Sequence, residues 1–116
     1  MELDELLVQF GFSRTFTKVL IYCTQHKDEI IRLHDVERAT DLRQPEVSVA
    51  MNNLVERKWI KAKTMPAVPG VTGRPGKSYR LVVSAPQIAK LIAKEIHERI
   101  DKDTKLAEDI RAAMKG

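Results

Sequence analysis

A segment rich in proline and glycine, residues 65–76, constrains the fold of this chain more than any other feature. It holds three of the five prolines and three of the five glycines in the sequence. Proline fixes φ and lacks a backbone N–H, and glycine weakens regular structure, so neither a helix nor a strand can run through it. The flanking runs, 59–64 and 77–83, are rich in β-forming residues. The sequence therefore predicts a hairpin with a long connecting loop.

Helical periodicity dominates the chain before this hairpin. Apolar residues at three- and four-residue spacing predict a short helix over 2–10, which Gly11 stops, and a second helix that Ser13 caps. A small edge strand is expected over 30–33. A short helix then ends near Asp41, at a turn position where a left-handed residue is usual and Asp is tolerated.

The next helix, residues 45–57, is well defined by local signals. Pro45 suits a first turn because its missing N–H would have no helical partner there. Glu46 complements the positive end of the helix dipole. The apolar residues at helical spacing form one stripe, so we expect them to be buried: Val47, Ala50, Met51, Leu54 and Val55.

A long apolar stripe follows the hairpin, in residues 84–116. The polar residues Asp-Lys-Asp-Thr at 101–104 interrupt it, so both one continuous helix and two shorter ones are compatible with the sequence. One small domain has little surface to cover so long a stripe, which favours a second copy of the chain, although folding back onto the same domain is the alternative. The expected dimer interface comprises Leu3, Leu7, Ile88, Leu91, Ile92, Ile96, Ile100, Leu106, Ile110 and Met114.

The positive charge of the chain is concentrated around the hairpin. The net charge is only +4, yet no acidic residue lies between Arg57 and Lys94. A basic hairpin that follows two adjacent helices can hold phosphates on both sides of a groove. A simple solvated face is the alternative, and it suits Lys90 and Lys94, which belong to the final helix.

The sequences VERATDL (36–42), PEVSVAMNNL (45–54) and WI (59–60), followed by GRPGKSYRL (73–81), resemble the winged helix–turn–helix domain of small prokaryotic regulators of the MarR and TrmB-like kind. The resemblance implies a mainly α fold with a small β hairpin (α+β). It divides the chain into a winged domain, 1–83, with its wing over 59–83, and a C-terminal dimerisation helix, 84–116. Residues 45–57 would be the recognition helix.

The outward face of that helix carries side chains that can read base edges in a major groove. Asn and Gln pair naturally with adenine, so an A·T-containing half-site is expected. Ordinary surface positions for the asparagines, and a dipole role for Glu46, are the alternatives to base contact. The candidate base contacts are Gln44, Glu46, Ser48, Val49, Asn52 and Asn53.

Phosphate contacts would set the register on the duplex. Arg74, flanked by Gly73 and Pro75, is the best candidate to enter a narrow minor groove. The complete set of expected backbone and wing contacts is Arg43, Arg57, Lys61, Lys63, Arg74 and Lys77.

Other classes of function find no support in the sequence. Cys23 is the single cysteine and lies in an apolar run, so a buried thiol is expected. No nucleophile, carboxylate pair, phosphate-binding loop or metal cluster has useful spacing, so we expect neither an enzyme nor a cofactor or metal. The acidic N-terminus and the lack of an 18-residue apolar run predict a cytoplasmic protein without a membrane span.

These patterns predict a homodimeric, sequence-specific regulator of transcription that binds double-stranded DNA. A winged-helix adaptor, which would present the face of 45–57 to a protein, is the alternative. The resemblance to MarR-like proteins implies a pocket for a small-molecule effector between the dimer helices and the winged domain, but the sequence does not identify the effector.

Overall fold

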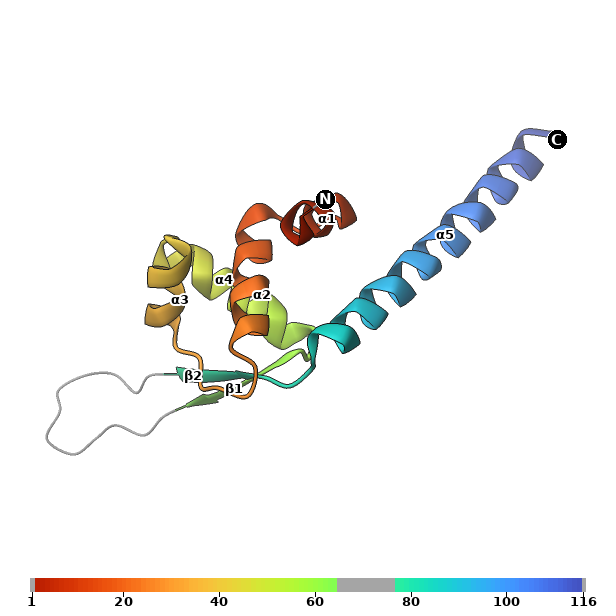
Figure 1. The fold of residues 1–116 in the computed structure, drawn as a ribbon. Coiled ribbons are helices and arrows are strands. Elements are labelled where there is room, and N and C mark those ends of the chain that lie inside the picture. Colours follow the sequence, from red (N-terminus) through yellow and green to blue (C-terminus); the bar gives the residue numbers. More distant parts are fainter. Residues whose placement is uncertain (1, 65–76, 116) are drawn as a thin grey trace, which may run out of the picture. The chain divides into compact units, whose positions relative to one another are not determined.

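The computed structural model describes residues 2–64 and 77–115 (Figure 1). The chain forms two compact units. The first, Met1–Ser84, is called the winged unit, and the second is Ala85–Gly116. The predicted loop and its Arg74 lie outside the described residues. In order, the elements are α1 (Leu3–Phe10), α2 (Arg14–Gln25), α3 (Leu33–Thr40), α4 (Gln44–Glu56), β1 (Ile60–Thr64), β2 (Lys77–Leu81) and α5 (Ala85–Lys115).

The local signals for helix ends are confirmed. The Oγ of Ser13 accepts a hydrogen bond of 3.0 Å from the backbone N–H of Phe16, which makes Ser13 the N-cap of α2. Asp41 adopts the left-handed conformation with φ 57°, as expected for the turn between α3 and α4. The tight turn allows α3 and α4 to pack against each other as the two helices of a helix–turn–helix.

The end of α4 uses a left-handed residue that is not glycine. Lys58 has φ 65°. Its N–H donates to the carbonyl of Val55 (2.9 Å), and the N–H of Trp59 donates to the carbonyl of Leu54 (3.1 Å). This pair of bonds is the Schellman motif, which satisfies carbonyls that a helix end would otherwise leave without partners. It also directs the chain from α4 straight into β1.

The core of the first unit is mostly aliphatic and lies where α2, α3, α4 and the hairpin meet. α2 packs against both α3 and α4, and α4 packs against β1. The stripe predicted for α4 is buried, except that Val55 is only half-buried. The fully buried side chains of this core include Val19, Leu20, Val36, Val47, Met51, Leu54, Ile60 and Leu81.

The hairpin is antiparallel, with Ile60 opposite Leu81 and Thr64 opposite Lys77. The predicted edge strand is much shorter than 30–33. Only Ile31 pairs, through two hydrogen bonds of 2.7 and 2.8 Å with Tyr79, because Arg32 already serves as the N-cap residue of α3. This single bridge adds the beginning of a third strand at the edge of the hairpin.

The second unit is one continuous helix. α5 spans 31 residues, or about 45 Å at the usual rise per residue. It passes through residues 101–104 without a break, which resolves the alternative that the sequence left open. These polar residues are solvent-exposed in the chain, so nothing in their chemistry requires the helix to end there.

Candidate nucleic-acid interface

The outward face of α4 holds most of the side chains predicted to contact bases. Gln44, Glu46, Val49, Asn52 and Asn53 are all exposed. Residues three and four positions apart share a helical face. Val49 therefore lies at the centre of this face, with Glu46 on the preceding turn and the two asparagines on the following one.

Ser48 departs from this arrangement. It was expected on the outward face, but it is half-buried, next in sequence to the fully buried Val47. A position beside the buried stripe leaves its hydroxyl less accessible than the amides of Asn52 and Asn53. Five of the six base-edge candidates are therefore well exposed, and Ser48 is the half-buried one.

The register of the hairpin sorts its cations into two faces. Cross-strand partners share a face of a sheet, and successive residues alternate between faces. Lys61 pairs with Arg80, and Lys63 pairs with Ser78, so Lys61, Lys63 and Arg80 share one face. Each of these three side chains is exposed. Arg80 was not among the predicted contacts, and only the register reveals it as the neighbour of Lys61.

Lys77 belongs to the other face. It pairs with Thr64, in the set that also contains the buried residues Ile60, Tyr79 and Leu81. Lys77 itself is exposed because it lies at the far end of the strand, beyond the core. Lys77 can therefore contact the same stretch of DNA backbone as Lys61 and Lys63 only if its side chain reaches round the end of the hairpin.

Arg57, a predicted phosphate contact, is half-buried against aromatic rings. Its guanidinium carbon Cζ lies 4.9 Å from the ring centroid of Phe12, 5.1 Å from that of Trp59 and 6.0 Å from that of Phe16. These are cation–π distances. Arg57 thus has partners within the winged unit, whereas Arg43, at the N-cap position of α4, is exposed.

Most of the residues expected at a dimer interface are exposed on α5. Leu91, Ile96, Ile100, Leu106, Ile110 and Met114 are exposed large hydrophobic residues, and Ile92 is half-buried. Ile88 is buried within the single chain. On α1, Leu3 is exposed, whereas Leu7 is buried within the single chain.

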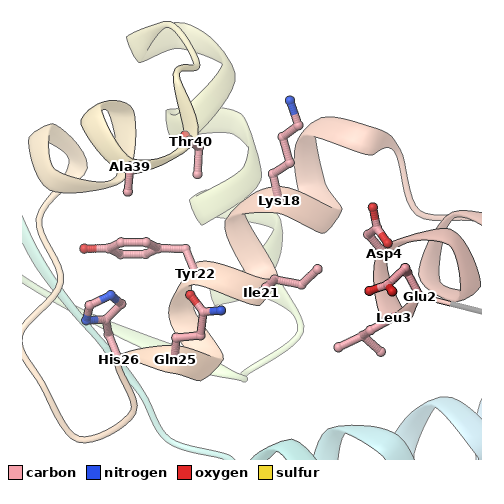
Figure 2. A pocket seen from close by; sticks show the side chains of 10 residues that line it. All are labelled: Glu2, Leu3, Asp4, Lys18, Ile21, Tyr22, Gln25, His26, Ala39 and Thr40. Carbon is pink, nitrogen blue, oxygen red and sulfur yellow. The ribbon is translucent and has the colours of Figure 1, made fainter.

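A separate open hollow lies among α1, α2 and α3, with a volume of about 740 Å³ (Figure 2). The Tyr22 side chain extends from α2 towards Ala39 and Thr40 of α3. The centroid of its ring lies 4.2 Å from the ring centroid of His26. Burial is the main cause that raises the pKa of Tyr22, so its phenol stays protonated at neutral pH. Both Asp4 and Lys18 also line the hollow. Because the lining contains both signs of charge, its electrostatics favour neither an anionic nor a cationic ligand.

Reactive groups are scarce in the described part of the chain. Burial raises the pKa of the Cys23 thiol to about 12, which keeps it as an unreactive thiol at neutral pH. Within residues 2–64 and 77–115, no cluster of three His, Cys, Asp or Glu side chains could hold a metal ion. No helix in those ranges is long and apolar enough to cross a membrane.

Comparison with known proteins identifies the fold. A possible transcriptional regulator from Methanosarcina mazei aligns with a TM-score of 0.71 at 16% identity, over 91% of this chain and 85% of that one. Staphylococcus aureus MepR in complex with DNA aligns with a TM-score of 0.52 at 19% identity, over 94% of this chain and 86% of that one. A MarR family regulator from Neisseria meningitidis gives 0.51 at 18% identity, over 97% and 80% of the two chains.

No family model and no curated protein matches the sequence. At these identities the structural likeness establishes the fold alone. It confirms the predicted class, a winged helix–turn–helix with a small hairpin and a long C-terminal helix, and the resemblance to MarR-like regulators.

Proposed function

We propose that this chain is a sequence-specific regulator of transcription that binds double-stranded DNA as a homodimer. The observation that carries the proposal is the outward face of α4, where Asn52 and Asn53 are exposed beside Val49. Asparagine is a poor helix former, and a plain solvated face would gain more stability from Lys, Glu or Ala. Its amide can instead hydrogen-bond adenine N6 and N7 in a major groove.

In this mechanism α4 enters the major groove and the hairpin lies along the backbone. Lys61, Lys63 and Arg80 supply one cationic face for phosphates, and Arg43 supplies a cation at the start of α4. These contacts fix register and orientation, while the side chains of α4 read the sequence. Arg74, outside the described residues, is the proposed minor-groove contact. The DNA complex of MepR, a protein of the same fold, is consistent with this use of the fold.

The homodimer would form through α5. Its apolar stripe is exposed over most of its length, and contiguous exposed apolar surface marks interaction sites in soluble proteins. Two protomers related by a two-fold axis would present two α4 helices to successive major grooves, about 34–36 Å apart, on a pseudo-palindromic site.

Selection from random DNA duplexes at moderate salt is the experiment that tests the proposal. We expect an enriched A·T-containing pseudo-palindrome, and Asn52→Ala should relax the preference at one base pair in each half-site. A uniform loss of affinity would remove Asn52 from the base contacts. The absence of any enriched motif would refute sequence-specific binding and favour the adaptor, in which the same face of α4 meets a protein.

The dimer is tested by sedimentation. Ile100→Lys places a charge in the exposed apolar stripe and should convert the dimer to a monomer. Asp101→Lys is the matched control, because Asp101 shares its helical face with the exposed residues Lys94, His97 and Lys105, and it should leave the mass unchanged. A monomeric parent protein, or an Ile100→Lys variant that still dimerises, would refute the proposed interface.

A further inference from the structure

Val49 is an exposed aliphatic side chain in the middle of the polar face of α4. It is 61% exposed. Its four neighbours at three- and four-residue spacing, Pro45, Glu46, Asn52 and Asn53, are exposed as well. A β-branched residue does not favour helix formation, and it leaves apolar surface in water. Valine at this position is therefore explained neither by helix stability nor by packing into the core of the winged unit.

An open hollow of about 370 Å³ lies beside Val49, between α4 and the start of α2. Its lining includes two almost completely buried apolar residues, Phe16 (6% exposed) and Ala50 (2% exposed). Val49 and Asn53 line the same hollow. The surface of α4 thus combines an apolar depression with an adjacent amide that can donate and accept hydrogen bonds.

This combination matches the edge that an A·T base pair shows in the major groove. Thymine presents its C5-methyl group there, and adenine presents N6 and N7. We propose that Val49 and the apolar lining of the hollow contact the 5-methyl group of one thymine in each half-site, and so determine specificity at that position. The proposal rests on the DNA binding proposed above and names the base that Val49 reads.

The charge at the hollow favours a methyl group over a phosphate as its occupant. Glu46 lines the hollow, and its negative charge would repel a phosphate oxygen there, whereas a methyl group carries no charge. The cations that can meet phosphates lie elsewhere, at Arg43 and on the Lys61 and Lys63 face of the hairpin. A base edge can therefore occupy the hollow while the backbone passes these cations.

Replacement of thymine by deoxyuridine tests the proposal, because it removes only the methyl group. In the site obtained by selection, each thymine is replaced singly and binding is measured by titration. One thymine per half-site should show about a fourfold loss of affinity on replacement, the value expected for one buried methyl group. In Val49→Ala, the difference between the affinities for the thymine and deoxyuridine duplexes at that position should become clearly smaller than fourfold.

Val82→Ala is the matched control, since it truncates another exposed valine outside α4 and should keep the fourfold difference. If sequence-specific binding is intact but no thymine shows the loss, the proposal for Val49 is wrong and the proposed function stands. If the full fourfold difference persists in Val49→Ala, Val49 does not determine specificity at that position, and the proposal is again wrong. If no duplex is bound specifically, both proposals fail.

Discussion

Replacement of Arg57 should reveal whether this cation stabilises the fold or holds DNA. Its guanidinium lies over Phe12 and Trp59 at 4.9 and 5.1 Å from the ring centroids. Phe12 precedes α2, and Trp59 precedes β1, so Arg57 links the end of α4 to two other parts of the winged unit. Arg57→Ala removes the cation and also the packing of its aliphatic stem.

The size of the effect follows from this geometry. A cation–π contact contributes about 0.5–1 kcal/mol when exposed and about 2 kcal/mol when desolvated. Arg57 is half-buried and lies within about 5 Å of two rings, so we expect Arg57→Ala to lower the free energy of unfolding by about 1–2 kcal/mol. Arg57→Lys should lower the free energy of unfolding by a smaller amount, because the ammonium keeps the positive charge. It should not restore the parental value, because an ammonium cannot stack on a ring as a planar guanidinium does.

Urea unfolding measures this change. Trp59 is the only tryptophan in the chain, and its ring is one of the contacts, so its fluorescence reports the site directly. Circular dichroism of the helices gives an independent probe of the same transition. All variants are compared at one protein concentration, because the proposed dimerisation would make apparent stability depend on it.

The salt dependence of DNA binding distinguishes the two roles. If Arg57 remains on the rings, Arg57→Ala leaves the slope of log K against log salt unchanged. Lys61→Ala, the control for a phosphate contact, should reduce the magnitude of the slope by about 1.8, which is about 0.9 for each protomer of the proposed dimer. An Arg57→Ala variant with parental stability and a slope reduced like that of Lys61→Ala would refute our reasoning and restore Arg57 as a phosphate contact.

Three further substitutions test individual features of the fold. Thr17 Oγ1 is buried without a hydrogen-bond partner among the described residues, so Thr17→Val should raise the free energy of unfolding by about 1 kcal/mol in urea denaturation. Lys58→Gly should also stabilise, by about 1 kcal/mol in the same assay, because φ 65° is unfavourable for a residue with a Cβ. Burial raises the pKa of Cys23 from 9.0 to about 12, so stability should fall as pH rises from about 9 towards 12. Cys23→Ala should remove that part of the pH dependence.

Local chemistry was sufficient to predict the elements of the winged unit. Ser13 caps a helix, Asp41 forms a left-handed turn and Pro45 starts a helix, and each acts on its immediate neighbours. These features can therefore be predicted from a few consecutive residues. The hairpin was predictable for the same reason. The edge strand was predicted too long because two local signals competed, and the beginning of α3 at Leu33 left only Ile31 to pair.

The candidate site was predictable only in part. The periodicity of α4 correctly placed Asn52 and Asn53 outside, because a helix repeats its faces regularly. Ser48 lies near the boundary between faces, where the neighbouring elements decide burial. The sequence also could not show which cations share a face of the hairpin, since that depends on the register of β1 with β2.

The sequence by itself thus determined the order of helices and strands, the outward face of α4 and the clustering of positive charge, because each depends on neighbours along the chain. Tertiary structure alone decided that Arg57 lies over aromatic rings, that Leu7 is buried and that Val49 borders an apolar hollow. These features arise where residues distant in sequence meet in space. No local pattern records which side chains will be neighbours there.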